Sequence, residues 1–78
     1  MTSFTREIPS PPGTVVNIFL GFDEEKDADL IARMENFLAG HLNCQRSDAI
    51  MGFYDMFGMT LHYSGTAAAS TYYTIEKR

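Results

Sequence analysis

The fold is decided by residues 14–40, TVVNIFLGFDEEKDADLIARMENFLAG, where the spacing of apolar residues changes once. Over residues 14–22 the side chains alternate in a way that predicts a β-strand. One side of this strand is wholly apolar and is expected to face the core. The other side is half polar and is expected to lie nearer to water. The expected core side consists of Val16, Ile18, Leu20 and Phe22.

The second half of the same stretch predicts a helix over residues 24–39. Asp23 is a favourable N-cap residue, and Gly40 stands where a left-handed C-cap usually falls. The apolar residues recur at the spacing of a single helical stripe, which is made of Leu30, Ile31, Met34, Phe37 and Leu38.

The flanking segment before this stretch predicts a weak strand followed by a break. Residues 2–8 alternate and are expected to form a short edge strand. Residues 9–13, PSPPG, contain three prolines and are expected to form a stiff surface connection, because proline donates no ladder hydrogen bond.

The segment after it is ambiguous over residues 47–57, which are rich enough in Ile, Phe and Tyr to form a strand. A helix is favoured, since the apolar residues recur at helical spacing, with Ser47 and Gly58 as caps. Residues 59–64 and 71–76 then alternate around the small loop GTAAA and predict a hairpin. Its polar face carries His62 and Tyr72.

Together these elements predict one α+β domain spanning residues 1–78. We expect a small, partly antiparallel sheet, built from the strand and the C-terminal hairpin, with two helices packed on one face. The Pro-rich connection at 9–13 would lie outside this core.

Composition limits the classes of function. With 45% hydrophobic and 21% charged residues the chain is typical of a soluble globular protein, and no apolar run approaches the ~18 residues of a membrane span. The N-terminus lacks the apolar stretch of a signal peptide, and Cys44 is the single cysteine, so a cytoplasmic location is expected. A net charge of −4 argues against nucleic acid or membrane as a direct partner.

No cofactor, metal or catalytic site is expected. A calcium loop beginning at Asp23 would need glycine at its sixth position, where Ala28 stands. His41 and Cys44 have the spacing of one zinc-ligand pair, but a second pair is missing. With Asp48 they also offer the residue types of a catalytic triad, without any known local signature. We therefore predict that the protein is not an enzyme.

Residues 23–29 hold half of the ten acidic residues of the chain. A helix start explains three or four of them, because carboxylates there face the positive end of the helix dipole. The surplus indicates a binding edge for a basic partner surface, an interpretation compatible with the first. The predicted partner-binding residues are Asp23, Glu24, Glu25, Asp27 and Asp29, aided by Tyr72 and His62.

In being short, acidic, poor in cysteine and free of catalytic motifs, the chain resembles the phage-borne anti-CRISPR proteins. The resemblance rests on size and character over the whole chain, so it assigns no residue. It implies an inhibitor that binds a CRISPR effector complex or its nuclease in the cytoplasm of a bacterial host, at a basic surface that otherwise holds DNA. The alternative is a structural interaction module or small homodimer that docks through a Phe- and Met-rich surface. A monomer is favoured, and the sequence leaves the oligomeric state open.

Overall fold

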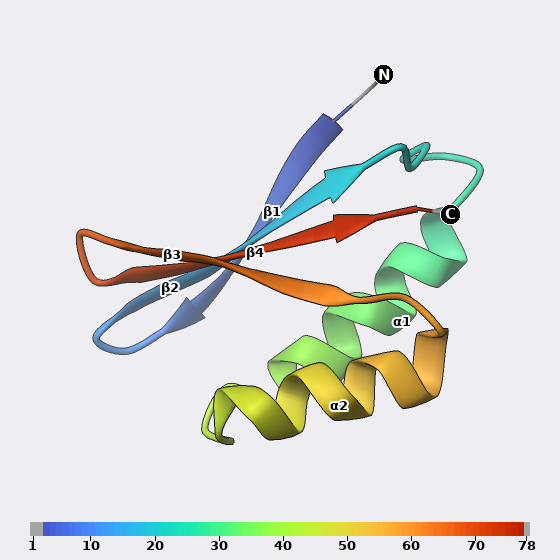
Figure 1. Cartoon of the computed structure of the whole chain (residues 1–78). Helices are drawn as coiled ribbons and strands as arrows, with labels where there is room; N and C mark the ends of the chain where they lie inside the picture. Colours follow the sequence, from blue (N-terminus) through green and yellow to red (C-terminus); the bar gives the residue numbers. More distant parts are fainter. Residues whose placement is uncertain (1–2, 78) are drawn as a thin grey trace.

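The computed structural model describes residues 3–77, which form four strands and two helices in the order ββααββ (Figure 1). The elements are β1 (Ser3–Ser10), β2 (Gly13–Leu20), α1 (Ala28–Ala39), α2 (Arg46–Phe57), β3 (Leu61–Ala67) and β4 (Ser70–Glu76). Neither helix of this part of the chain is long and apolar enough to cross a membrane.

The four strands form one mixed sheet in the order β1-β2-β4-β3. β1 pairs with β2 and β3 pairs with β4, both antiparallel, whereas the central strands β2 and β4 run parallel. Parallel neighbours need a long crossover connection, which α1 and α2 supply. Both helices lie on one face of the sheet (Figure 1). The prediction of an α+β fold with helices on one face is confirmed, and the expected edge strand is β1.

The prediction for the two faces of β2 is wrong about which side the helices cover, although Val16 and Phe22 are buried as expected, at 6% and 1% exposed. Phe19 lies on the helix side and is 0% exposed, stacked on Phe4 at 5.1 Å between ring centroids. Val16, Ile18 and Leu20 point to the opposite side from Phe19, away from the helices; there Val16 is buried between its neighbours, and Ile18 and Leu20 are half-buried. Both sides of this strand carry large apolar residues, so apolar content alone did not reveal which side the helices cover.

Gly21 explains why Phe22 nevertheless belongs to the core. Its φ of 77° is in the left-handed region, which ends the alternation of the strand. Phe22 is therefore only 1% exposed and meets Phe19 edge-on at 5.4 Å between ring centroids.

Each helix contributes a short buried stripe to this core. α1 buries Ile31, Met34 and Leu38, as predicted. α2 is a helix, as favoured from the sequence, and buries Ala49 and Phe53. The two helices meet through aromatic rings, since Phe37 of α1 lies edge-on to Phe53 and Phe57 of α2 at 5.8 and 5.9 Å between centroids.

Several predicted helix ends differ. α1 begins at Ala28 and not at residue 24, because residues 23–27 form a separate hydrogen-bonded turn. Gly40 is right-handed, with φ −74°, and not a left-handed cap. The N-cap of α2 is Gln45 and not Ser47, whereas Gly58 is left-handed as predicted.

The proline-rich segment also differs from the prediction of a connection over residues 9–13. Pro9 and Ser10 belong to β1 and pair with Thr14 and Gly13, so only Pro11 and Pro12 form the turn. An edge strand tolerates proline because one side of its backbone has no partner strand.

In the C-terminal hairpin, most of the predicted GTAAA loop is strand. β3 continues to Ala67 through a bulge between Tyr63 and Gly65, where Gly65 has φ 105°. The turn is only Ala68 and Ala69, both with positive φ.

Candidate functional site

The acidic segment forms a compact structure at the end of β2, here called the acidic turn (residues 23–29). Asp23 Oδ1 accepts hydrogen bonds from the backbone N–H groups of Glu25 and Lys26, both at 2.8 Å. Asp27 Oδ2 accepts the backbone N–H of Asp23 at 2.8 Å, and the Asp27 N–H donates to the Asp23 carbonyl at 2.9 Å. The Asp23 carboxylate thus caps the N–H groups of Glu25 and Lys26, the Asp27 carboxylate caps the N–H of Asp23, and together these bonds hold the turn.

These hydrogen bonds also set the charge of the turn. The N–H groups of Lys26 and Glu25 lower the pKa of the Asp23 carboxyl. The Asp23 N–H lowers the pKa of Asp27, aided by the Lys77 ammonium, whose Nζ lies 2.6 Å from Asp27 Oδ1. Both aspartates are therefore ionised at neutral pH, and three of their four carboxylate oxygens are already engaged within the protein.

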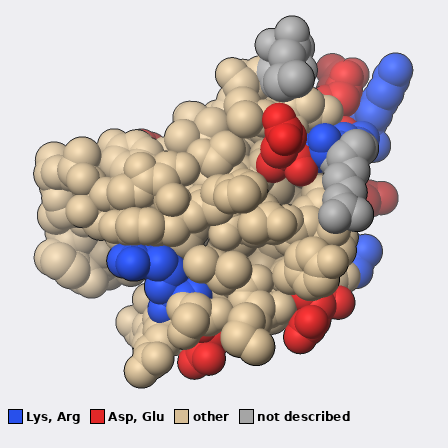
Figure 2. Space-filling model, in the orientation of Figure 1, with Lys and Arg blue, Asp and Glu red and all other residues tan. Residues whose placement is uncertain are grey.

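The other three carboxylates point outward. Glu24 lies 3.3 Å from Arg6 in an ion pair whose side chains are 58% and 41% exposed. Such exposed pairs contribute about 0–1 kcal/mol, so a partner could replace Arg6 at little cost. Glu25 and Asp29 are exposed, and their side chains have no hydrogen bond or ion pair within residues 3–77. Figure 2 shows acidic and basic side chains side by side at one end of the molecule.

A hollow opens beside the acidic turn, here called the acidic hollow, with a volume of about 490 Å³. Its polar wall comes from the turn and its aromatic wall from the core. The protein's own Arg6 and Lys77 lie over the rings of Phe4 and Phe22, at 5.6 and 5.9 Å from the centroids. The hollow is lined by Ser3, Phe4, Phe22, Asp23, Glu24 and Glu25.

His62 and Tyr72 lie on the open face of the sheet, where the sequence placed them. His62 pairs with Thr74, and Tyr72 pairs with Val16 of the central strand. Glu76 pairs with Leu20 at the end of β2 that leads into the acidic turn, and Tyr72 lies four residues, or about 13 Å of strand, before Glu76. The structure therefore brings the five acidic residues together but places Tyr72 away from them.

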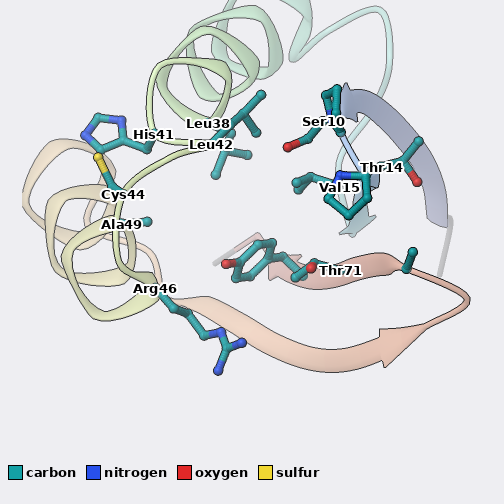
Figure 3. A pocket seen from close by; sticks show the side chains of 14 residues that line it. Ser10, Thr14, Val15, Leu38, His41, Leu42, Cys44, Arg46, Ala49 and Thr71 are labelled. Carbon is teal, nitrogen blue, oxygen red and sulfur yellow. The ribbon is translucent and has the colours of Figure 1, made fainter.

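Two surfaces were missed from the sequence. The first is the open face of β2, with Val16, Ile18 and Leu20; an apolar pattern on both sides of one strand was its signal. The second is a pocket of about 310 Å³ at the end of the sheet where the hairpin turns lie, here called the end pocket (Figure 3). It is formed where the α1–α2 connection approaches both turns, and no local motif encodes it.

His41 and Cys44 both line this pocket, and within residues 3–77 no hydrogen bond joins their side chains. The His41 ring stacks on Phe37 at 4.0 Å between centroids, and its Nδ1 lies 2.7 Å from the Phe37 carbonyl oxygen. Cys44 is exposed. Within residues 3–77 no three His, Cys, Asp or Glu side chains converge as metal ligands.

Comparisons of the chain with protein-family models, with curated proteins and with solved structures give no match. Any function must therefore be argued from the arrangement of the residues themselves.

Proposed function

We propose that this protein is an inhibitor that binds a basic, nucleic-acid-holding surface of a nucleic-acid-processing complex, in the manner of an anti-CRISPR protein acting on a CRISPR effector. It would act by occupying that surface rather than by chemistry. The observation that carries the proposal is the acidic hollow, where carboxylates and aromatic rings line one concavity.

An arginine or lysine side chain of a partner fits this chemistry. Its cationic head would meet Glu24 and Glu25, and its stem and charge would lie against Phe4. Basic surfaces that hold nucleic acid display such side chains in rows. Complementary charge speeds encounter and fixes orientation, and its effect weakens with salt.

The rigidity of the acidic turn supports the same function. Asp23 and Asp27 hold the backbone, so binding orders little of this segment, and ordering is a principal cost of association. In the proposed complex Asp23 and Asp27 hold the turn, and Glu24, Glu25 and Asp29 contact the partner.

The test is protection of a phage from CRISPR interference in bacteria that express the protein, across a panel of effector types. The Glu24→Lys, Glu25→Lys variant should lose protection, because both changes reverse charge in the hollow while the Asp23 and Asp27 contacts remain. The Asp48→Lys, Asp55→Lys variant changes the net charge equally on α2 and should keep it. Failure of the unmodified protein against every effector type, or full protection by the Glu24, Glu25 variant, contradicts the proposal.

The open face of the sheet favours a second candidate, a homodimer built on the half-buried Ile18 and Leu20. The expected surface rich in Phe and Met is not available, because the Phe residues belong to the core or pack against it. Of the Met residues, Met51 and Met56 are 66% and 57% exposed. Four strands about 4.8 Å apart and about 23 Å long would bury roughly 900 Å² in total, just below the ~1,000 Å² of a specific interface. A monomer in light scattering at high protein concentration, unchanged by Ile18→Lys, would dismiss this candidate.

A further inference from the structure

The end pocket is lined by a largely buried tyrosine whose hydroxyl keeps some exposure and has no partner among residues 3–77. Tyr73 of β4 is 9% exposed and lines the pocket. Its hydroxyl makes no hydrogen bond with any residue of 3–77, although a buried tyrosine normally finds one. The surface that Tyr73 still exposes therefore faces the pocket, where the hydroxyl is available to a ligand.

The opposite wall offers further donors. α2 is a twelve-residue helix whose N-cap, Gln45, makes no side-chain capping bond. The backbone N–H groups of Arg46 and Ser47 have no acceptor among the described residues. Arg46 also lines the pocket, and its guanidinium lies outside it, 3.6 Å from the centroid of the Tyr63 ring, where it would have to turn to reach a ligand. Together with the helix dipole, this end of the pocket favours an anion.

The rest of the lining is mixed: Ser10, Thr14 and Thr71 supply hydroxyl groups, whereas Leu38 and Leu42 face Val15 across the pocket (Figure 3). None of the fourteen lining residues is Asp or Glu, in a protein whose net charge is −4. The volume of about 310 Å³ is at the lower end of small-molecule sites.

We propose that the end pocket binds a carboxylate carried on a small apolar body. The carboxylate accepts hydrogen bonds from the Tyr73 hydroxyl and the first turn of α2, with Arg46 as its counter-charge. The body packs on Leu38, Leu42 and Val15. A carboxylate suits the single arginine better than a phosphate, which would bring nearly two charges. Such a ligand is either a small organic acid or the C-terminal residue of a peptide.

The test is an NMR titration of the intact protein with phenylacetate, with neutral phenylacetamide as the matched probe. We expect saturable shifts at Leu38, Ala49 and Val15 with phenylacetate and much weaker ones with the amide. Tyr73→Phe removes only the hydroxyl and should weaken phenylacetate binding about tenfold, the loss of one hydrogen bond to a charged group. Tyr72→Phe, on the other face of the sheet, should leave it unchanged.

A second pair of variants removes the charge. Arg46→Gln should weaken binding by a similar factor, whereas Arg33→Gln, which loses a cation over the Phe57 ring, should not. Acetyl-Ala-Phe with a free C-terminus, compared with its C-terminal amide, distinguishes a peptide ligand from a small acid. The proposal is overturned if the lining residues do not shift up to about 10 mM phenylacetate, if phenylacetamide binds equally well, or if Tyr73→Phe binds as the unmodified protein does.

Discussion

Replacing Asn17 by leucine should make the protein more stable. Asn17 lies on the helix side of the central strand β2, is 0% exposed, and neither its Nδ2 nor its Oδ1 has a hydrogen-bond partner. Its neighbours across the sheet are Arg6 and Tyr73. Leucine has the same number and branching of side-chain heavy atoms, so it fills the site without an unsatisfied polar group.

The magnitude follows from two opposing contributions. Each buried polar group left unsatisfied costs about 1–3 kcal/mol, and Asn17 has two. The methyl groups of leucine are larger than the amide they replace, and overpacking a core costs about 1–3 kcal/mol. We therefore expect the free energy of unfolding to rise by about 2 kcal/mol. In a domain of this size that corresponds to an increase in Tm of roughly 10 °C.

Guanidinium unfolding followed by far-UV circular dichroism measures this change. The midpoint should rise while the slope of free energy against denaturant stays the same, because the surface exposed on unfolding is nearly unchanged. Asn43→Leu is the matched control, since Asn43 is exposed in the α1–α2 connection and should change the stability by less than about 0.5 kcal/mol.

A stability of Asn17→Leu equal to or below that of the unmodified protein, with an unchanged slope and a neutral control, would refute the reasoning. The Asn17 amide would then be satisfied in solution, and the buried polar group would stabilise the fold rather than cost it free energy.

Three further predictions concern the turns. The pKa values of Asp23 and Asp27 lie below the ordinary 3.8, so their contribution to stability is present above about pH 4 and is lost as pH falls through the lowered values. Replacing both by Asn should lower the denaturant midpoint at pH 7 and should make that midpoint fall less steeply as the pH is lowered. An unchanged dependence of the midpoint on acid pH would contradict this. Ala68→Asn with Ala69→Gly should raise the free energy of unfolding by about 1 kcal/mol, because both residues have positive φ and Asn-Gly favours such a turn; a lower denaturant midpoint would count against it. Gly13→Ala should destabilise by about 1–3 kcal/mol in the same assay, since a Cβ there would lie 1.9 Å from the Ala69 carbonyl oxygen, and a neutral result would mean that the two hairpin turns do not touch.

Local spacing was sufficient to predict the kinds of elements in this chain. α2 was favoured as a helix from its apolar spacing, and Phe53 is buried there, although the neighbouring Tyr54 is 51% exposed. The facing of β2 could not be predicted, because it depends on Phe4 and Ile75, which flank Phe19 in neighbouring strands far away in sequence.

The same limit applies to the candidate sites. The cluster of five acidic residues was evident from the sequence. Which of them hold the turn and which point outward was not evident, because this depends on the hydrogen bond between Asp23 and Asp27 and on the contact of Asp27 with Lys77. The end pocket escaped prediction altogether, since its walls come from the α1–α2 connection and from both hairpin turns.

The parallel pairing of β2 with β4 has a consequence for how fast the protein folds. Each hairpin closes through a tight turn and forms from neighbouring residues, but the sheet becomes continuous only when Val15 meets Thr71 across both helices. Closing so long a loop costs entropy before its contacts form, so docking of the two hairpins should limit the folding rate. A substitution at Ile18 or at its partner Thr74 should therefore slow folding. A substitution in either hairpin turn should mainly speed unfolding.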